Sequence, residues 1–277
     1  MDAAAQYNSL FNSENEGYCV FEVIFNHTGQ PEDLLYLQAS PAYERMTGFG
    51  SVAGRRITEV DPGIKTSLVS VYAGVVLTGV PVRVEHYMPS ADGWFLSYVM
   101  PKQGVQIAVI LNNITERRFK NEKQQYLLQL GDQLRTMADP IAIQQMACRL
   151  LGEYTGADRV LYGDVTDERM IRICQHFENG VPAINGVFDI KDFGEGMVDT
   201  FKRNEKIIIE DIHTTPTGLS DYHERYTAMQ VSAFACIGLV KNGRWVAIFG
   251  MTHSTARKWT PLEIALMEET AERTWRL

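Results

Sequence analysis

The chain has 277 residues, of which 45% are hydrophobic, 22% charged and 10% aromatic. This composition is that of ordinary globular domains and excludes a disordered tail, a collagen and a mini-protein, while the length predicts two domains. The formal net charge of −8 makes nucleic acid and an anionic membrane poor partners.

The cysteines and the longest uncharged stretch restrict the compartment. The 4 cysteines form no Cys-x-x-Cys pair, so we expect reduced, buried thiols and no disulfide scaffold or zinc ribbon. The uncharged stretch Thr66–Val82 contains glycine, proline and hydroxyl residues, which argues against a membrane span. The segment Met1–Phe11 lacks the basic start and apolar core of a signal peptide. We therefore expect a cytoplasmic protein.

Strand-like runs and turn residues alternate over the first hundred residues. Pro41 and Gly48 bound a short helix, and Asp61 with Pro62 starts a longer one that ends at Gly79. Five runs have strand character: 18–25, 34–38, 82–88, 94–100 and 105–111. The order predicts a five-stranded antiparallel sheet with helices on one face.

This order resembles the PAS domain family. The segment Leu37–Gly48 is similar to the family's segment after its second strand, and Asn112–Arg118 is similar to the ending that joins the last PAS strand to an output helix. Ser40 and Asn113 stand where the family usually has Asn and Asp, at the positions that link the core to the output helix. The resemblance implies a PAS-like sensor domain over residues 1–114.

Residues 115–138 are charged, lack proline and predict one helix. Leu127, Leu130, Leu134 and Met137 follow the 3-4 spacing of a coiled-coil seam. The stripe favours a homodimer through this helix, with packing on its own domains as the alternative. On the dimer interpretation, lysine at positions 130 and 134 is expected to produce monomers.

A second α+β unit is predicted from residue 139 onward. Asp139 and Pro140 begin a helix, Asn242-Gly243 forms a hairpin turn, and Thr260 with Glu263 forms a capping box that opens the last helix. The expected strands are 159–165, 170–177, 206–211, 232–240 and 244–253, with helices at 140–154, 197–204, 220–229 and 260–275.

This second unit is similar to a GAF domain over residues 139–277. The resemblance rests on Gly156–Tyr162, the strand Ile208–Asp211, the hairpin Phe234–Gly243 and the segment Trp259–Met267. The fold class is therefore α+β, with two antiparallel sheets flanked by helices and joined by a long helix. Tandem PAS and GAF domains resemble the input region of bacterial sensor histidine kinases in two-component signal transduction, which implies a kinase or other output domain as downstream partner.

The sequence contains no known catalytic motif. Phosphate-binding loops, the GxSxG and HExxH motifs and a kinase catalytic domain are all lacking, so we expect no enzyme activity. His213, His223 and His253 lie near Asp211 and Asp221, but their spacing matches no metal-ligand motif. No metal is expected.

The sequence requires no cofactor, and it does not identify one that the protein binds. Residues 217–230 lack the cysteine that attaches a bilin in some GAF photoreceptors, and Cys174 and Cys236 lie on predicted strands. Haem needs only one axial histidine, for which His86 and His176 are candidates.

A small-molecule site is expected between the sheet and helices of the GAF-like half. Tyr222, Tyr226 and Met229 share one helical face, Phe234 and Cys236 share a strand face, and Phe193 lies in a glycine-rich segment that could form a lid. These residues are either ligand wall or plain core. The leading hypothesis is a non-catalytic sensory module; the alternatives are a chromophore- or haem-binding sensor and a ligand-free interaction scaffold.

Overall fold

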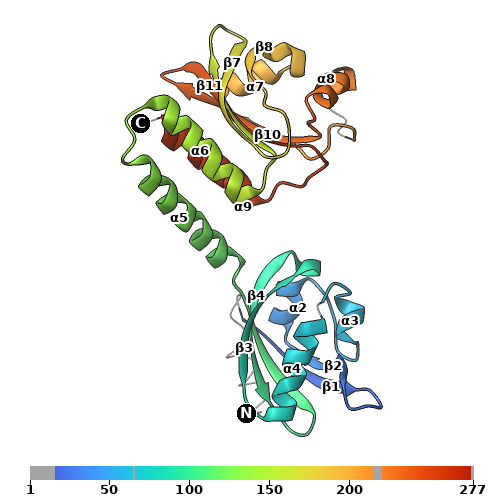
Figure 1. Cartoon of the computed structure of the whole chain (residues 1–277). Coiled ribbons are helices and arrows are strands. Elements are labelled where there is room, and N and C mark those ends of the chain that lie inside the picture. Colours follow the sequence, from blue (N-terminus) through green and yellow to red (C-terminus); the bar gives the residue numbers. More distant parts are fainter. Residues whose placement is uncertain (1–15, 65, 215–219, 276–277) are drawn as a thin grey trace. The chain divides into compact units, whose positions relative to one another are not determined.

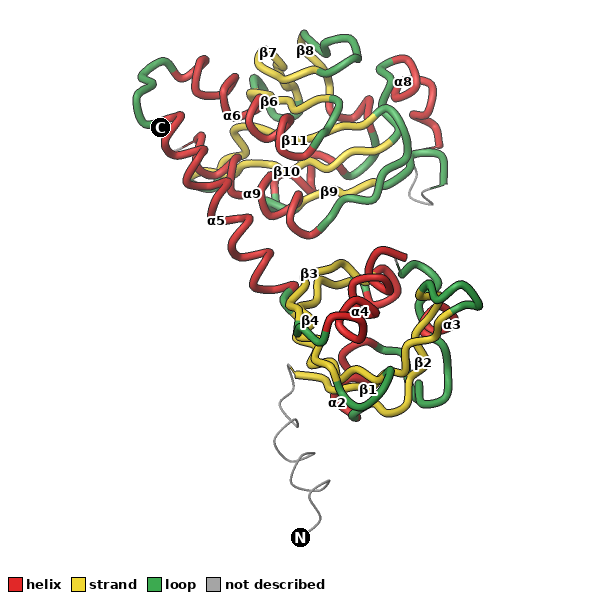
Figure 2. The backbone as a smooth tube through the Cα atoms, turned by 60° about the horizontal axis from the view of Figure 1, so that its bottom comes forward, coloured by secondary structure: helices red, strands yellow, loops and turns green. Residues whose placement is uncertain are grey.

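The computed structural model describes residues 16–64, 66–214 and 220–275, without the side chains of Thr66, Cys174, Gln175, His176 and Ser220. The segment Met1–Phe11, in which no signal peptide was expected, therefore lies outside the described residues. The chain divides into two compact units, Met1–Lys120 and Asn121–Leu277. Each has its own sheet and helices (Figure 2).

The first unit contains the expected five-stranded antiparallel sheet, in the order β2-β1-β5-β4-β3. Its central strand β5 alternates buried and half-buried residues, as a sheet with one covered face requires. The strands are β1 (Glu16–Phe25), β2 (Pro31–Ala39), β3 (Val82–Met88), β4 (Gly93–Pro101) and β5 (Gln106–Asn113).

Helices connect β2 to β3 and cover the sheet. They are α2 (Pro41–Thr47), α3 (Ile57–Val60) and α4 (Thr66–Thr78), and the 3₁₀ turn η1 (Pro89–Ala91) lies between β3 and β4. Ser40 caps α2 by accepting a hydrogen bond from the Tyr43 amide, and its hydroxyl also accepts one from the Tyr18 amide at 3.0 Å. Serine thus ties the helix to β1 at the position where the sequence departs from the PAS pattern.

The long helix of this unit begins later than expected. Asp61, Pro62 and Gly63 form a turn in which the Ile64 amide donates to the Asp61 carbonyl, and the described helix α4 starts at Thr66. The preceding helix α3 was not predicted, because its four residues are too few to show a helical hydrophobic period.

Helix α5 (Thr115–Leu134) crosses the division between the two units. The Asn113 side chain accepts a hydrogen bond from the Thr115 amide at 3.0 Å, so asparagine caps this helix. The helix ends before the predicted residue 138. Asp139 and Pro140 start the next helix, and a proline disfavours helical backbone at the residue before it.

The second unit has a six-stranded antiparallel sheet, in the order β8-β7-β6-β11-β10-β9. Its strands are β6 (Arg159–Val165), β7 (Met170–Glu178), β8 (Gly186–Asp189), β9 (Lys206–Ile209), β10 (Ala233–Lys241) and β11 (Arg244–His253). Its helices are α6 (Pro140–Thr155), α7 (Met197–Lys202), α8 (His223–Ala228) and α9 (Pro261–Trp275), with 3₁₀ turns η2 (Ile190–Phe193) and η3 (Ser220–Tyr222).

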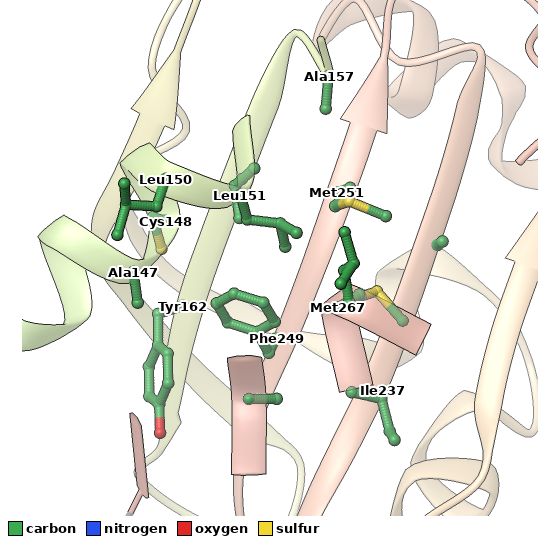
Figure 3. Packing of buried hydrophobic residues seen from close by; sticks show 14 of the residues in the cluster. Ala147, Cys148, Leu150, Leu151, Ala157, Tyr162, Ile237, Phe249, Met251 and Met267 are labelled. Carbon is green, nitrogen blue, oxygen red and sulfur yellow. The ribbon is translucent and has the colours of Figure 1, made fainter. Parts of the chain in front are cut away.

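Each face of this sheet carries its own hydrophobic cluster. On one face, α6 and α9 lie side by side (Figure 1) and pack with the second half of α5 on residues such as Tyr162 and Phe249. Figure 3 shows this helix-side cluster, in which Leu151 and Met267 approach the sheet from α6 and α9. On the other face, η2, α7 and α8 cover a second cluster. The sheet is therefore the shared wall of two cores.

The capping box expected at the start of α9 is confirmed. The Thr260 amide donates to the Glu263 carboxylate at 2.8 Å, and the Glu263 amide donates to the Thr260 hydroxyl at 3.2 Å. Strand β8, in contrast, was predicted as part of a glycine-rich loop, because a four-residue strand bounded by Gly186 has almost no sequence signal. Within the described ranges, no helix combines the length and hydrophobicity needed to cross a membrane.

Candidate functional site

A cavity of about 80 Å³ lies in the second unit, between the sheet and its η2, α7 and α8 face. Its walls are almost entirely aliphatic and aromatic, and the two lining residues with a hydroxyl group are Thr252 and Tyr226. The lining side chains are those of Leu161, Ile171, Ile173, Ile184, Ile190, Phe193, Met197, Phe201, Tyr226, Met229, Val231, Phe234, Cys236, Ile248 and Thr252.

Five of the six residues proposed from sequence as a ligand wall line this cavity. They are Phe193, Tyr226, Met229, Phe234 and Cys236. Tyr222 packs against the same hydrophobic cluster without lining the cavity. The structure thus brings the set together, on the side of the sheet away from α6 and α9.

Aromatic stacking fixes the wall formed by η2, α8 and β10. The Tyr226 ring stacks on Phe234 with centroids 5.3 Å apart, and Phe193 meets Tyr226 edge-on at 6.0 Å. The Tyr226 hydroxyl donates to the Phe193 carbonyl at 2.8 Å. Because burial raises the pKa of Tyr226, this hydroxyl stays protonated and is already engaged. The wall therefore presents mainly apolar surface to a ligand.

Helix α7 approaches the sheet closely because of Gly238. A Cβ atom at this position would lie 2.6 Å from the Phe201 Cβ and 2.7 Å from its Cα. Only glycine leaves room for this contact. Gly238 therefore sets how closely α7, which carries the cavity residue Met197, sits on the sheet.

Arg159 holds two segments that border the cavity. Its side chain is 1% exposed. The guanidinium donates to the Pro182 carbonyl at 2.7 Å and to the Met229 carbonyl at 2.8 Å. Longer hydrogen bonds of 3.4 Å reach the Gln230 carbonyl and the Thr252 hydroxyl. The sequence around Arg159 contains no local signal of this role.

The environment of Arg159 is unusual for a charged group. Burial lowers its pKa, an effect that the negative charges of Asp158 and Glu178 oppose. A buried guanidinium needs its donors satisfied, and here backbone carbonyls from two separate segments do so. The arginine is therefore a structural clamp between the β7–β8 connection and the end of α8.

The thiol in the cavity wall is unsuited to covalent attachment. Burial raises the pKa of Cys236 to about 12, so the nucleophilic thiolate is scarce at neutral pH. Cys174 and His176, also named in the sequence analysis, have side chains outside the described residues.

The histidines of this unit do not form a metal site in the described part of the chain. His213 and His223 lie edge to face with ring centroids 5.2 Å apart, and the His223 ring contacts the Ile212 carbonyl at 2.6 Å. His253 lies 3.7 Å from the Asp158 carboxylate. Among the described residues, no group of three histidine, cysteine or carboxylate side chains is placed to hold a metal ion.

The predicted coiled-coil seam lies largely within the helix-side core. Leu130 and Leu134 are 1% and 2% exposed and belong to the cluster with α6 and α9, while Leu127 and Met137 pack at its border. For Leu130 and Leu134, the structure favours the alternative in which the stripe packs on its own domain, because this chain alone already covers them.

The two sheets and their helices define a PAS-like domain followed by a GAF domain, a class of sensory module. Residues 139–276 match the GAF domain family, and this part of the chain belongs to it. No curated protein matches the chain in sequence.

Solved structures of bacteriophytochromes are similar in fold to this chain over most of its length. The chromophore-binding domain of an unusual bacteriophytochrome from R. palustris is 18% identical over 94% of this chain and 91% of that chain, with a TM-score of 0.51. A longer structure of the R. palustris protein is 18% identical over 94% and 57% of the two chains, with a TM-score of 0.50. The chromophore-binding domain of the Stigmatella aurantiaca bacteriophytochrome is 17% identical over 95% of this chain and 94% of that chain, with a TM-score of 0.48. At these identities, the likeness describes the fold.

The cavity in this chain does not fit a bilin. An apolar cavity of about 150 Å³ holds a ligand of the size of benzene, and the cavity here has about 80 Å³. A linear tetrapyrrole is far larger and carries propionates that need cationic partners, whereas the lining residues are almost all apolar. The guanidinium of Arg159 is engaged by backbone carbonyls.

Proposed function

We propose that this chain is a non-catalytic sensory input module whose GAF cavity takes a small apolar ligand. One observation carries the proposal: the strands that line the cavity also form the floor of the helix-side core. Phe234 faces the cavity cluster and Ala235 the helix-side cluster, and Ile248 and Phe249 divide in the same way. A ligand that moves these strands acts on both cores.

The helix layer offers a route from the sheet toward α5. The Thr270 hydroxyl of α9 donates to the Leu266 carbonyl, so the Tyr126 hydroxyl of α5 donates to Thr270 at 2.8 Å. Lys123 and Glu269 add an ion pair at 2.9 Å. In our proposal, a change in the sheet shifts α9 and, through these contacts, α5. The ligand's differential affinity for the two arrangements limits the size of this shift.

The linker helix α5 is the element through which we expect the chain to dimerise and to pass its signal on. We infer a cytoplasmic homodimer, with residues 115–138, helical up to Leu134, as the linker between domains 1–114 and 139–277. Leu128 of α5 is 61% exposed and supplies apolar surface for a second copy. We propose that a shift of α5 regulates an output domain, such as a histidine kinase, which is the downstream partner of the module.

Xenon tests the cavity, because it is a small apolar probe that enters apolar cavities. We expect the full chain to show one saturable site by ¹²⁹Xe NMR. Cys236→Leu, which adds volume inside the cavity, is expected to abolish that site. Ile208→Leu is the control, since Ile208 lies on the neighbouring strand and is 39% exposed. Xenon binding that survives in Cys236→Leu would rule out the cavity as the site.

A second candidate function is chromophore binding, which the fold likeness to the R. palustris chromophore-binding domain favours. Our leading proposal expects the purified chain, incubated with biliverdin, to keep no visible absorbance band after gel filtration. The reason is the small apolar cavity with its protonated Cys236 thiol. A stable band that photoconverts would establish the chromophore function and replace the apolar ligand.

A further inference from the structure

A separate cavity of about 260 Å³ lies in the first unit, where α4 meets β3 and β4. Ile64, Leu68, Val84 and Trp94 provide apolar walls, and Asp61 and His86 provide polar groups. Its volume is just below the range of roughly 300–1,000 Å³ typical of drug-sized ligands, so it suits a smaller molecule and excludes haem at His86.

Asp61 is a buried carboxylate with incomplete hydrogen bonding. It is 1% exposed, and its Oδ1 accepts a hydrogen bond from the Ser90 hydroxyl at 2.5 Å. Its Oδ2 is buried and has no hydrogen-bond partner among the described residues. An isolated buried carboxylate is costly unless further donors or a cation reach it. The free oxygen therefore needs a donor.

His86 adds a second acceptor to the same cavity. Burial lowers the pKa of His86 to about 4, against the opposing effects of a hydrogen bond to the Val84 backbone and the charge of Asp61. The ring is therefore neutral at pH 7. Nδ1 is buried without a partner in the described structure. In the tautomer that carries its proton on Nε2, Nδ1 is an acceptor.

The neighbouring charges are already paired with one another. Glu85, at the edge of the cavity, forms ion pairs with Arg117 at 3.1 Å and with Arg118 at 3.4 Å. The Arg118 guanidinium also lies 3.8 Å from the centre of the Trp94 ring. These arginines belong to the first turn of α5 and are held on Glu85 and Trp94. Among the described residues, no side chain thus occupies the two inner acceptors, Asp61 Oδ2 and His86 Nδ1.

We propose that this cavity binds a small primary ammonium compound with an apolar body, whose N–H groups donate to Asp61 Oδ2 and His86 Nδ1. A primary ammonium group carries a positive charge and three N–H donors. Two of these donors are enough to hydrogen-bond to one carboxylate oxygen and one neutral imidazole nitrogen. The alkyl or aryl body lies along Ile64, Leu68 and Val84. This site is independent of the function proposed for the GAF cavity.

Phenethylammonium is a suitable probe, and isothermal titration calorimetry of the full chain is the measurement. We expect saturable binding, with phenethyl alcohol, the uncharged analogue, at least tenfold weaker. Asp61→Asn is expected to weaken phenethylammonium binding roughly 10- to 100-fold, because a charge-assisted hydrogen bond is lost. The asparagine oxygen can still accept from Ser90, so this variant is expected to fold.

Glu32→Gln is the matched control, since it removes an exposed carboxylate of β2 away from the cavity and is expected to leave binding unchanged. His86→Ala is expected to weaken binding while keeping the preference for the ammonium over the alcohol. The proposal is overturned if the full chain does not bind phenethylammonium saturably. It is also overturned if Asp61→Asn binds phenethylammonium as tightly as the unaltered chain does.

Discussion

Replacing Arg159 by methionine is expected to lower the free energy of unfolding of the GAF domain by about 3–5 kcal/mol. The substitution keeps much of the side-chain volume but removes the donors to the carbonyls of Pro182, Met229 and Gln230. Each buried acceptor left without a partner costs about 1–3 kcal/mol. Urea denaturation of the full chain, followed by tryptophan fluorescence and circular dichroism, measures the effect.

Arg149→Met is the matched control for this prediction. Arg149 lies on α6, is 65% exposed at its side chain, and pairs with Glu153 at 3.2 Å. Exposed pairs of this kind contribute about 0–1 kcal/mol, so the control is expected to unfold almost as the original chain does. Equal stability of Arg159→Met and Arg149→Met would contradict the role of Arg159 as a clamp.

Truncating Leu130 to alanine is the second large effect, with an expected loss of about 2–4 kcal/mol in the free energy of unfolding. Leu130 is 1% exposed in the helix-side core, and removing its buried methyl groups leaves a cavity that the surroundings only partly refill. Differential scanning calorimetry of the full chain gives the change in stability.

Leu128→Lys, two residues away on the same helix, separates folding from assembly. Because Leu128 is 61% exposed, this substitution is expected to leave the unfolding free energy within about 0.5 kcal/mol. If the exposed face of α5 forms the dimer, multi-angle light scattering shows monomers for Leu128→Lys. If Leu130→Ala kept full stability but dissociated into monomers, Leu130 would contact a second chain and would not belong to the core of its own chain.

Local sequence signals were sufficient for most of the elements. Pro41, Gly48 and the pair Thr260 and Glu263 mark helix ends through backbone chemistry that depends on few neighbours, and the structure has helices there. The end of α5 was placed too late. A charged stretch without proline looks helical up to Asp139, whereas α5 ends at Leu134 and Asp139 caps the next helix.

The candidate sites were partly predictable for a physical reason. Aromatic residues at helical and strand spacing, such as Tyr226 and Phe234, indicate the face on which a core or ligand wall forms. Arg159 has its partners 23 to 93 positions away, and so no local spacing indicates its role. Asp61 stands before Pro62 as an ordinary turn residue. Its burial appears only when Ser90, 29 positions away, is brought to it.

The most direct test is whether filling the GAF cavity changes the structure of α6 and α9, which lie on the opposite face of the sheet. The measurement is a series of two-dimensional ¹H–¹⁵N spectra of the full chain at rising xenon pressure, with Cys236→Leu as the control. The account predicts saturable shifts of amide signals in α6 and α9, and none of these in Cys236→Leu. Saturable shifts confined to the residues that line the cavity would contradict it, since the ligand would then bind without reaching the helices.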